Sequence, residues 1–130
     1  MKHIRFWSTC AILYAVAIFV GSAIPGPNLP DAVQAVSDKI LHATEYGIFG
    51  FIVYRALAGQ QKWPMIARYA VLGASIAVCL YGASDEFHQL FVPGRVADVL
   101  DWLADTAGGL VGVLISTWWL SRSRRGAAGA

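Results

Sequence analysis

Charged side chains are scarce in this sequence. Asp, Glu, Lys and Arg make up 14% of its 130 residues, and 57% of the residues are hydrophobic. An average soluble domain has about 25% charged and roughly 45–50% apolar residues. The hydrophobic residues form long blocks, which are typical of membrane-spanning helices rather than of one large soluble core. The composition therefore argues against an ordinary soluble domain.

Motifs that define familiar chemistries are also missing. The chain has no HExxH or CxxC spacing, no glycine-rich phosphate loop, no nucleophile elbow and no nucleic-acid-binding motif. Several enzyme classes and a nucleic-acid partner are therefore not expected. The two cysteines, Cys10 and Cys79, lie inside apolar runs without a neighbour at metal-ligand spacing. They are interpreted as small packed side chains, and no disulfide is predicted.

Four apolar segments predict four helices, at residues 6–24, 38–58, 69–84 and 97–120. Prolines in residues 25–30 end the first segment, Ser37 is a predicted N-cap of the second, and Gly59 closes it. Residues 59–68 are predicted to form a short polar connection. The third segment is short for a membrane crossing, so its helix is expected to continue through Ser84.

The expected fold is all-α: an integral membrane bundle of four transmembrane helices that forms a single domain, residues 1–130. One alternative concerns the first segment, because Gly21-Ser22-Ala23 is a passable cleavage site for a signal peptide. The apolar run is longer than a usual signal-peptide core, so a retained helix is favoured. The other three helices would keep their arrangement in either case.

Basic residues are distributed unequally over the two sides of this predicted bundle. Eight of the ten lie on the side of both termini: Lys2, Arg5, Arg55, Lys62, Arg68, Arg122, Arg124 and Arg125. All eight acidic residues lie on the opposite side, together with Lys39 and Arg95. Because cytoplasmic loops collect Lys and Arg, both termini are assigned to the cytoplasm. The predicted location is the bacterial plasma membrane, with several crossings and membrane lipid as a partner.

The remaining polar residues are concentrated around residues 84–95 and on two of the predicted helices. The stretch and the residues after it contain Asp85, Glu86, His88, Gln89, Arg95, Asp98, Asp101 and Asp105. On the second segment Asp38, His42 and Glu45 recur at steps of four and three, which places them on one helix face. Ionisable side chains are costly in lipid, so this cluster is the predicted functional site.

The fourth segment carries a stripe with acids in its outer half and glycines in its inner half. Gly108 and Gly112 predict that another helix approaches closely there, which would turn the acids of the same stripe toward the bundle interior. Structural explanations stay open for several residues. Asp98 could be an N-cap with Asp101 at N3, and Ser84 could cap a short helix that starts at Asp85. His42 could be a satisfied core histidine, and Arg95 a solvated loop charge.

Charge balance sharpens the prediction of a site. Seven carboxylates of the cluster face only Lys39 and Arg95, so either some carboxylates are protonated or a cation binds, either a metal or a cationic ligand group. Catalytic candidates are His42, Glu45, Asp85, Glu86, His88, Asp101 and Asp105. Ligand-binding candidates are Asp38, Lys39, His42, Asp85, Glu86, Gln89, Arg95, Asp98 and Asp101. A divalent metal is an open alternative, with His42, Asp85, His88 and Asp101 as candidate ligands.

At these residues the chain resembles the VanZ-like family of small bacterial membrane proteins, over most of residues 38–115. The matching elements are Asp38-Lys39-x-x-His42 with Glu45-Tyr46, Asp85-Glu86-x-x-Gln89-x-Phe91-x-Pro93-Gly94-Arg95, and Asp98 and Asp101 with Gly108-x-x-x-Gly112. One departure is Asp105, where the family usually has asparagine. The resemblance implies a membrane protein, and the founding member is associated with resistance to the glycopeptide antibiotic teicoplanin.

Three functional hypotheses follow. The first is a binding or envelope-modulating protein whose outward pocket recognises a lipid head group, an antibiotic or a peptidoglycan-linked lipid. In it Arg95 would meet an anionic group, and the acids would meet a cation or hydroxyls. The second is a small membrane enzyme acting on a lipid-linked substrate at the outer leaflet, with His42 or His88 as base. The third is proton-coupled transport through the carboxylates.

Overall fold

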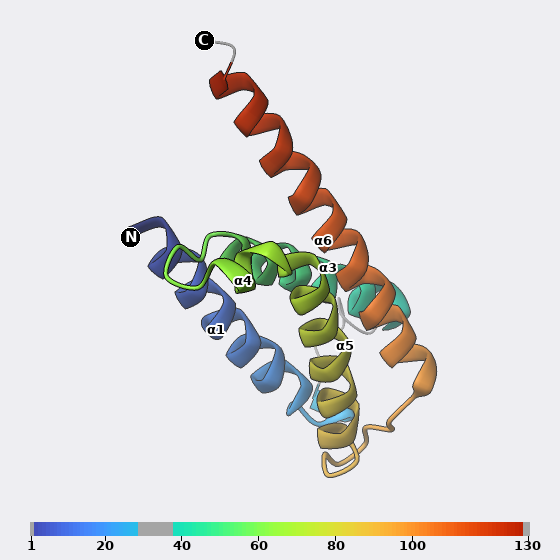
Figure 1. Cartoon of the computed structure of the whole chain (residues 1–130). Coiled ribbons are helices and arrows are strands. Elements are labelled where there is room, and N and C mark those ends of the chain that lie inside the picture. Colours follow the sequence, from blue (N-terminus) through green and yellow to red (C-terminus); the bar gives the residue numbers. More distant parts are fainter. Residues whose placement is uncertain (1, 29–37, 129–130) are drawn as a thin grey trace.

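A computed structural model describes residues 2–28 and 38–128, which form helices and their connections and contain no strand. The elements are α1 (Lys2–Ser22), the short 3₁₀ helix η1 (Gly26–Asn28), α3 (Asp38–Ala58), α4 (Pro64–Arg68), α5 (Ala70–Gln89) and α6 (Val99–Ala128) (Figure 1). The predicted all-α class is confirmed. The predicted cap Ser37 lies outside the described residues.

Two predicted boundaries need correction. The connection at residues 59–68 contains α4, which starts with Pro64 at a position where proline is well tolerated. The third helix does not end near Ser84 but continues to Gln89. Ser84 is therefore no helix cap, and its hydroxyl instead donates a hydrogen bond of 2.7 Å to the carbonyl of Tyr81 within α5. As a consequence, the first half of the polar stretch at residues 84–95 is helical, up to Gln89.

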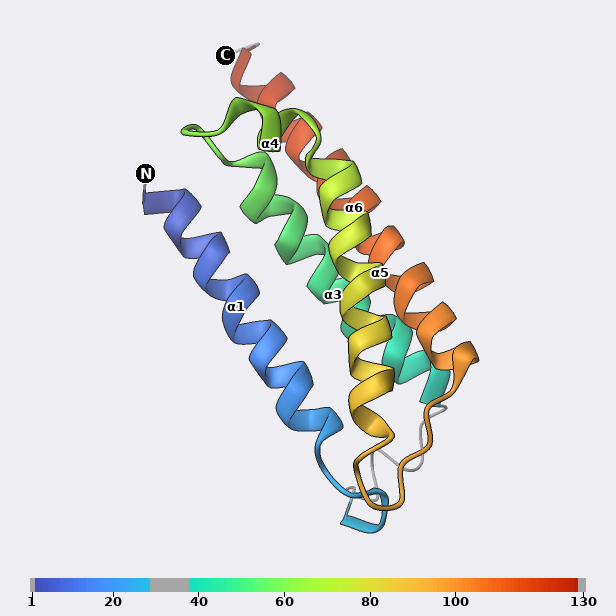
Figure 2. The same ribbon diagram turned by 60° about the horizontal axis from the view of Figure 1, so that its bottom comes forward.

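The four long helices lie side by side, and α3 contacts each of the other three. Figure 2 shows that the start of α1, α4 and the end of α6 lie at one end of the bundle. The turn after α1 and the connection between α5 and α6 lie at the opposite end, which is called the site end below. There the backbone N–H of Gly26 donates to the carbonyl of Pro93 at 3.2 Å. This contact joins the turn after α1 to the connection that precedes α6.

Helices α3 and α6 approach each other closely along the predicted glycine stripe. A Cβ atom added at Gly108 would overlap the backbone carbonyl of Ala43, and one added at Gly112 would overlap that of Gly47. The predicted close approach is therefore confirmed, and α3 is the helix that uses it. The approach also sets the first turns of α3 beside the first turns of α6, where their acidic residues lie.

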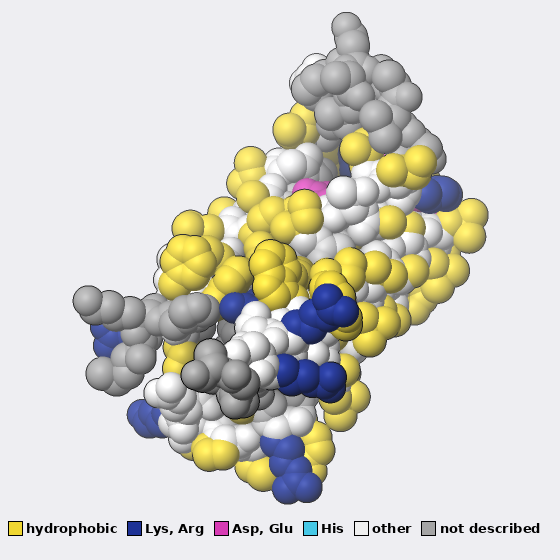
Figure 3. All heavy atoms as spheres, turned by 90° about the horizontal axis from the view of Figure 1, so that it is seen from above, with side chains coloured by type: hydrophobic (Ala, Val, Ile, Leu, Met, Phe, Trp, Pro, Cys, Tyr) yellow, Lys and Arg dark blue, Asp and Glu magenta, His cyan; other side chains and the backbone are white. Residues whose placement is uncertain are grey.

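The outer surface of the bundle is strongly apolar. Ile12, Leu13, Leu80 and Leu114 are each more than 60% exposed, and hydrophobic side chains cover much of the face in Figure 3. Large exposed apolar surfaces mark contact with a membrane or a partner. Among the described residues, three helical segments are long and apolar enough to cross a membrane: Ile4–Ser22, Ala70–Gln89 and Val99–Ser123.

Candidate functional site

Polar side chains from four helices meet at the site end. Because α1 and α5 end here and α3 and α6 begin here, residues far apart in the sequence become neighbours. Seven of these polar residues are buried: Ser22, His42, Asp85, Glu86, Gln89, Asp101 and Asp105. Buried polar groups require partners, so their contacts define the site.

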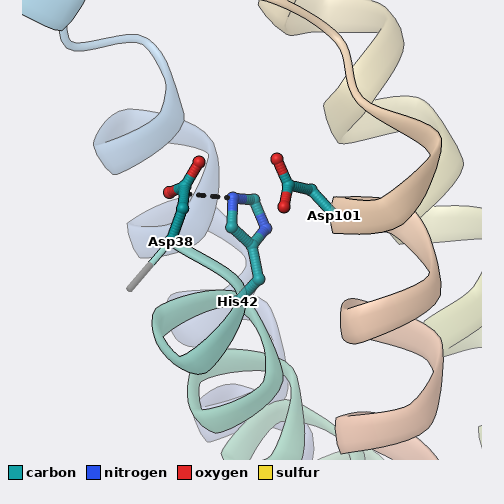
Figure 4. A group of neighbouring side chains, drawn as sticks. All are labelled: Asp38, His42 and Asp101. Carbon is teal, nitrogen blue, oxygen red and sulfur yellow. Dashed lines mark ion pairs between the residues drawn. The ribbon is translucent and has the colours of Figure 1, made fainter. Parts of the chain in front are cut away.

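His42 lies between carboxylates at the centre of the site. Its Nδ1 atom is 2.8 Å from Oδ1 of Asp105, a side chain with no exposed surface. Its Nε2 atom is 3.7 Å from Oδ1 of Asp38, one helical turn earlier on α3. Figure 4 shows Asp38 and His42 on α3 facing Asp101 on α6. His42 is thus a partnered buried histidine, and it also lies where three acids converge.

Lys39 joins the first turns of α3 and α6. Its ammonium group donates to Oδ1 of Asp101 at 2.6 Å and to Oδ2 of Asp98 at 3.1 Å. The other oxygen of Asp98 accepts from the backbone N–H of Leu100 at 2.8 Å, so the predicted N-cap is confirmed. The pKa of Asp98 lies below its usual value, mainly because of the hydrogen bond from Leu100 and, to a smaller extent, because of the Lys39 ammonium group. Lys39 therefore compensates two of the acids.

Glu86 completes the cap of α6 from a neighbouring helix. Its Oε2 accepts from the backbone N–H of Asp98 at 2.8 Å, which is the bond that an acid at N3 makes in a capping box. The prediction that Asp101 takes this role is wrong, because Asp101 is turned to Lys39 instead. Among the described residues, the second oxygen of Glu86 and Oδ2 of Asp105 are buried and lack a hydrogen-bond partner.

A second polar network connects α1, α5 and the connection before α6. The hydroxyl of Ser22 donates to Asp85 at 2.5 Å, Gln89 donates to the other Asp85 oxygen at 3.4 Å, and Arg95 donates to Gln89 at 3.2 Å. Arg95 is half-buried rather than a solvated charge. It follows Gly94, whose φ of 73° favours glycine and makes the tight turn that directs the chain back to the site.

A cavity of about 430 Å³ opens beside both networks. Its polar wall consists of Ser22, Asp38, His42, Glu45, Asp85, Gln89 and Arg95. Its other wall is mainly apolar and includes Tyr14, Leu41 and Ile48. A larger hollow of about 760 Å³ runs along α3 and α6 and is lined mostly by apolar residues. The two hollows share Thr44 and Ile48, so they adjoin each other.

The structure divides the predicted site residues into a lining set and a buried set. The ligand-binding candidates Asp38, His42, Asp85, Gln89 and Arg95 line the cavity, as does the catalytic candidate Glu45. Glu86, Asp101 and Asp105 are buried at the contact of α5 and α6 with α3. Lys39 and Asp98 form the ion pair that closes the start of α6.

His88 and the predicted metal ligands lie in different places. The His88 ring stacks on Phe19 with a centroid distance of 4.3 Å, and its Nδ1 is 3.5 Å from the Ser22 hydroxyl. Within the described chain, two groups offer three ligand atoms within 4.8 Å of one another: Asp38, His42 and Asp101, and His42, Glu86 and Asp105. Of the four predicted metal ligands, His42 and Asp101 belong to one of these possible metal-binding groups. Asp85 and His88 instead lie in the network around Ser22.

Several residues that line the cavity were not predicted from the sequence, among them two on α1 with hydrogen-bonding side chains. Ser22 is hydrogen-bonded to Asp85, and Tyr14 lines the cavity. A signal for both existed, because they are the only residues with hydrogen-bonding side chains between residues 10 and 24. Ser22 was interpreted only as part of a possible cleavage site, and its place opposite Asp85 depends on how α1 packs.

The fold and the site define a small helical membrane protein with a buried polar cluster at one end of its bundle. The chain belongs to the VanZ/LLP1 family, whose sequence model matches residues 4–120. This match confirms the resemblance drawn from the motifs and extends it to the first helix. No curated protein and no solved structure matches the chain.

Proposed function

We propose that this protein crosses the bacterial plasma membrane four times, with both termini in the cytoplasm and the site end at the outer leaflet. Helix α3 is the crossing that apolarity alone does not identify. It has 21 residues, as α1 does, and it packs against α1, α5 and α6. Its acidic and basic residues lie among its first eight residues, apart from Arg55, whose guanidinium lies 4.9 Å over the Trp7 ring.

The distribution of charge supports this orientation. Most of the Lys and Arg side chains visible in Figure 3 gather at the end that carries α4, and little Asp or Glu reaches that face. Arg122 lies over the ring of Trp118 at 4.5 Å near the end of α6. Basic residues and tryptophans at one end of a bundle are typical of the cytoplasmic interface.

The cavity at the site end is the observation that carries the proposed function. Its wall contains three carboxylates, from Asp38, Glu45 and Asp85, against one guanidinium, from Arg95. Such a wall favours a ligand that brings an amine or several hydroxyls and one anionic group. The protein therefore binds the polar head group of an envelope molecule at the outer leaflet.

The adjoining apolar hollow indicates that this molecule is linked to a lipid. It begins near Lys39, runs along α3 and α6 and shares Thr44 and Ile48 with the polar cavity. A hydrocarbon chain in this hollow would leave its head group beside Arg95 and Glu45. Together with the VanZ/LLP1 membership, this supports a role in envelope modulation that lowers sensitivity to glycopeptides of the teicoplanin type.

Lipid retention by the purified protein tests the proposal. The wild type and a variant with Glu45→Gln, Asp85→Asn and Arg95→Gln would be purified in the same mild detergent and compared by native mass spectrometry. The wild type is expected to retain an amine- or hydroxyl-bearing envelope lipid that the variant loses. Gln61→Ala, at the opposite end of the bundle, is the matched control and should retain it. Equal lipid content in wild type and pocket variant would reject the proposal.

The same comparison addresses a second candidate function, chemistry on the bound head group. It is favoured by the contact of His42 with buried Asp105, because a carboxylate that orients an imidazole is the usual arrangement of a general base. If the protein is an enzyme, lipid recovered from the wild type contains a converted product, and lipid recovered from His42→Ala contains only the substrate.

A further inference from the structure

Two buried carboxylate oxygens beside His42 have no partner among the described residues. They are Oδ2 of Asp105, on a side chain without exposed surface, and Oε1 of Glu86, on a residue 7% exposed. A buried acceptor without a partner costs about 1–3 kcal/mol, and more if it is charged. Neither carboxylate has a Lys or Arg within 4.0 Å in the described part of the chain. His42 contacts only the other oxygen of Asp105, at 2.8 Å, so these two acceptors still need a partner.

We propose that His42, Glu86 and Asp105 form a binding site for a divalent transition-metal ion, with Zn²⁺ as the best fit. Ligand atoms of the three residues lie within 4.8 Å of one another, and all three residues are buried. Two carboxylates and a neutral imidazole balance the charge of one divalent ion. The inference goes beyond the proposed binding of a head group and does not depend on it.

The three candidate ligand atoms are close enough to be compared with those around a bound zinc ion. Ligand atoms of a four-coordinate zinc ion lie roughly 3.3 Å apart, given bonds of about 2.0–2.2 Å. The limit of 4.8 Å on the present separations is wider, so binding of an ion would draw the three side chains together. Gly82 lies directly against Asp105, since a Cβ at residue 82 would lie 3.2 Å from Oδ2 of Asp105. Gly82 precedes Glu86 by one helical turn, so both face the same space.

The kind of ligands favours zinc over other common ions. One imidazole nitrogen and two carboxylate oxygens leave a fourth position for water, which is the arrangement of zinc sites with an open coordination position. Magnesium and calcium prefer sites made of oxygen atoms alone. Binding through Nδ1 would replace the proton held between His42 and Asp105, and Asp38 would remain 3.7 Å from the other ring nitrogen as an outer partner.

The other possible group around His42 is a poorer site. It uses Asp38, whose side chain is 63% exposed, and Asp101, which already accepts a hydrogen bond of 2.6 Å from Lys39. An ion there would have to displace an ammonium group and compete with water. The two groups share His42, so variants of their carboxylates distinguish them.

Metal content measured on the full chain tests the inference. The protein would be purified in detergent without a polyhistidine tag and dialysed against Zn²⁺. Bound zinc would be counted by mass spectrometry, and its affinity measured by competition with a coloured chelator. We expect one zinc ion per wild-type chain and a loss of affinity of at least about 100-fold in Glu86→Gln and in Asp105→Asn, since even outer partners cost 10–100-fold. Asp101→Asn is the matched control and should bind close to wild type.

The double variant Glu86→Gln/Asp105→Asn guards against a loss caused by misfolding. Without metal it should melt at or above the temperature of the metal-free wild type, because two buried carboxylates that have no Lys or Arg partner lose their charge while the amides can still accept from His42 and the Asp98 backbone. Zinc should raise the melting temperature of the wild type and leave that of the double variant unchanged. No bound zinc in the wild type, equal affinity in the double variant, or an equal loss in Asp101→Asn would each overturn the site. Lipid retention is measured separately, so the two proposals can fail independently.

Discussion

The carboxylate of Asp98 has two functions at the start of α6. One oxygen accepts from the backbone N–H of Leu100, and the other forms an ion pair with Lys39 on α3. Both contacts favour the ionised form, so the pKa of Asp98 in the folded protein lies below its ordinary value of 3.8. A depressed pKa means that these contacts stabilise the fold fully above that ordinary value. The contribution is lost as the pH falls through the lower, folded-state pKa.

Replacement of Asp98 by asparagine isolates the ion pair, because asparagine is an equally good N-cap. At neutral pH we expect Asp98→Asn to melt below the wild type in the same detergent. The difference should shrink as the pH falls below 3.8, since the wild-type carboxylate then also becomes neutral. Melting curves of both proteins between pH 7 and pH 3 provide the measurement. A difference that is constant over this range would show that the ion pair with Lys39 does not stabilise the fold.

Single residues could be placed from the sequence where a local rule applies. The cap at Asp98 follows from its position before an apolar run, and the shared face of Asp38, His42 and Glu45 follows from helical spacing. The identity of each partner could not be derived this way. Glu86 satisfies the backbone of Asp98 only because α5 ends beside the start of α6. Such pairings depend on how helices pack, which periodicity does not encode.

At the scale of elements, the approach of α3 to α6 depends on small residues. We expect Gly112→Ala to lower the free energy of unfolding by about 1–3 kcal/mol, because the new methyl group would overlap the carbonyl of Gly47 and push the helices apart. Denaturant or thermal unfolding in detergent measures this change. Gly126→Ala is the matched control, because no atom lies within 4 Å of a Cβ at that position. Equal stability of Gly112→Ala and the control would show that the packing tolerates a side chain.

The end of α5 shows why one element was predicted too short. The sequence turns polar at Ser84, and this change predicts the end of a membrane-spanning helix. Asp85, Glu86 and Gln89 are instead buried by α1, α3 and α6, so the helix continues while its polar residues face inward. Polarity marks the end of a helix in lipid only where the polar residues face lipid. For α6, the sequence did predict that the acids face the bundle interior, because its glycines and acids form one stripe.

The whole molecule has one end that is rich in basic residues and one that is rich in acids. Three of its long helices would be recognised as membrane crossings by apolarity alone, and α3 would not. The four long helices, their order and the clustering of acids at one end were predictable, because they follow from apolar blocks and charge positions, whereas the short α4 was not. The cavity was not predictable in its shape, because it lies between α1, α3 and α5 and depends on their separation.

The proposed orientation of the molecule makes a prediction that labelling in cells can check. In a background with Cys10→Ala and Cys79→Ala, single cysteines would be introduced at Val96 and at Gln61. Val96 lies in the connection between α5 and α6 and is 79% exposed, and Gln61 is exposed between α3 and α4. Because Lys and Arg gather at the end of the bundle that contains α4, that end should face the cytoplasm. We expect a membrane-impermeant maleimide to label Val96→Cys in intact spheroplasts and to label Gln61→Cys only after permeabilisation.

The reverse pattern would place the acidic cavity in the cytoplasm, where it could not meet an envelope molecule at the outer leaflet. Labelling of both positions from outside would instead mean an even number of crossings between them, and α5, the only long helix between these two positions, would then not span the membrane.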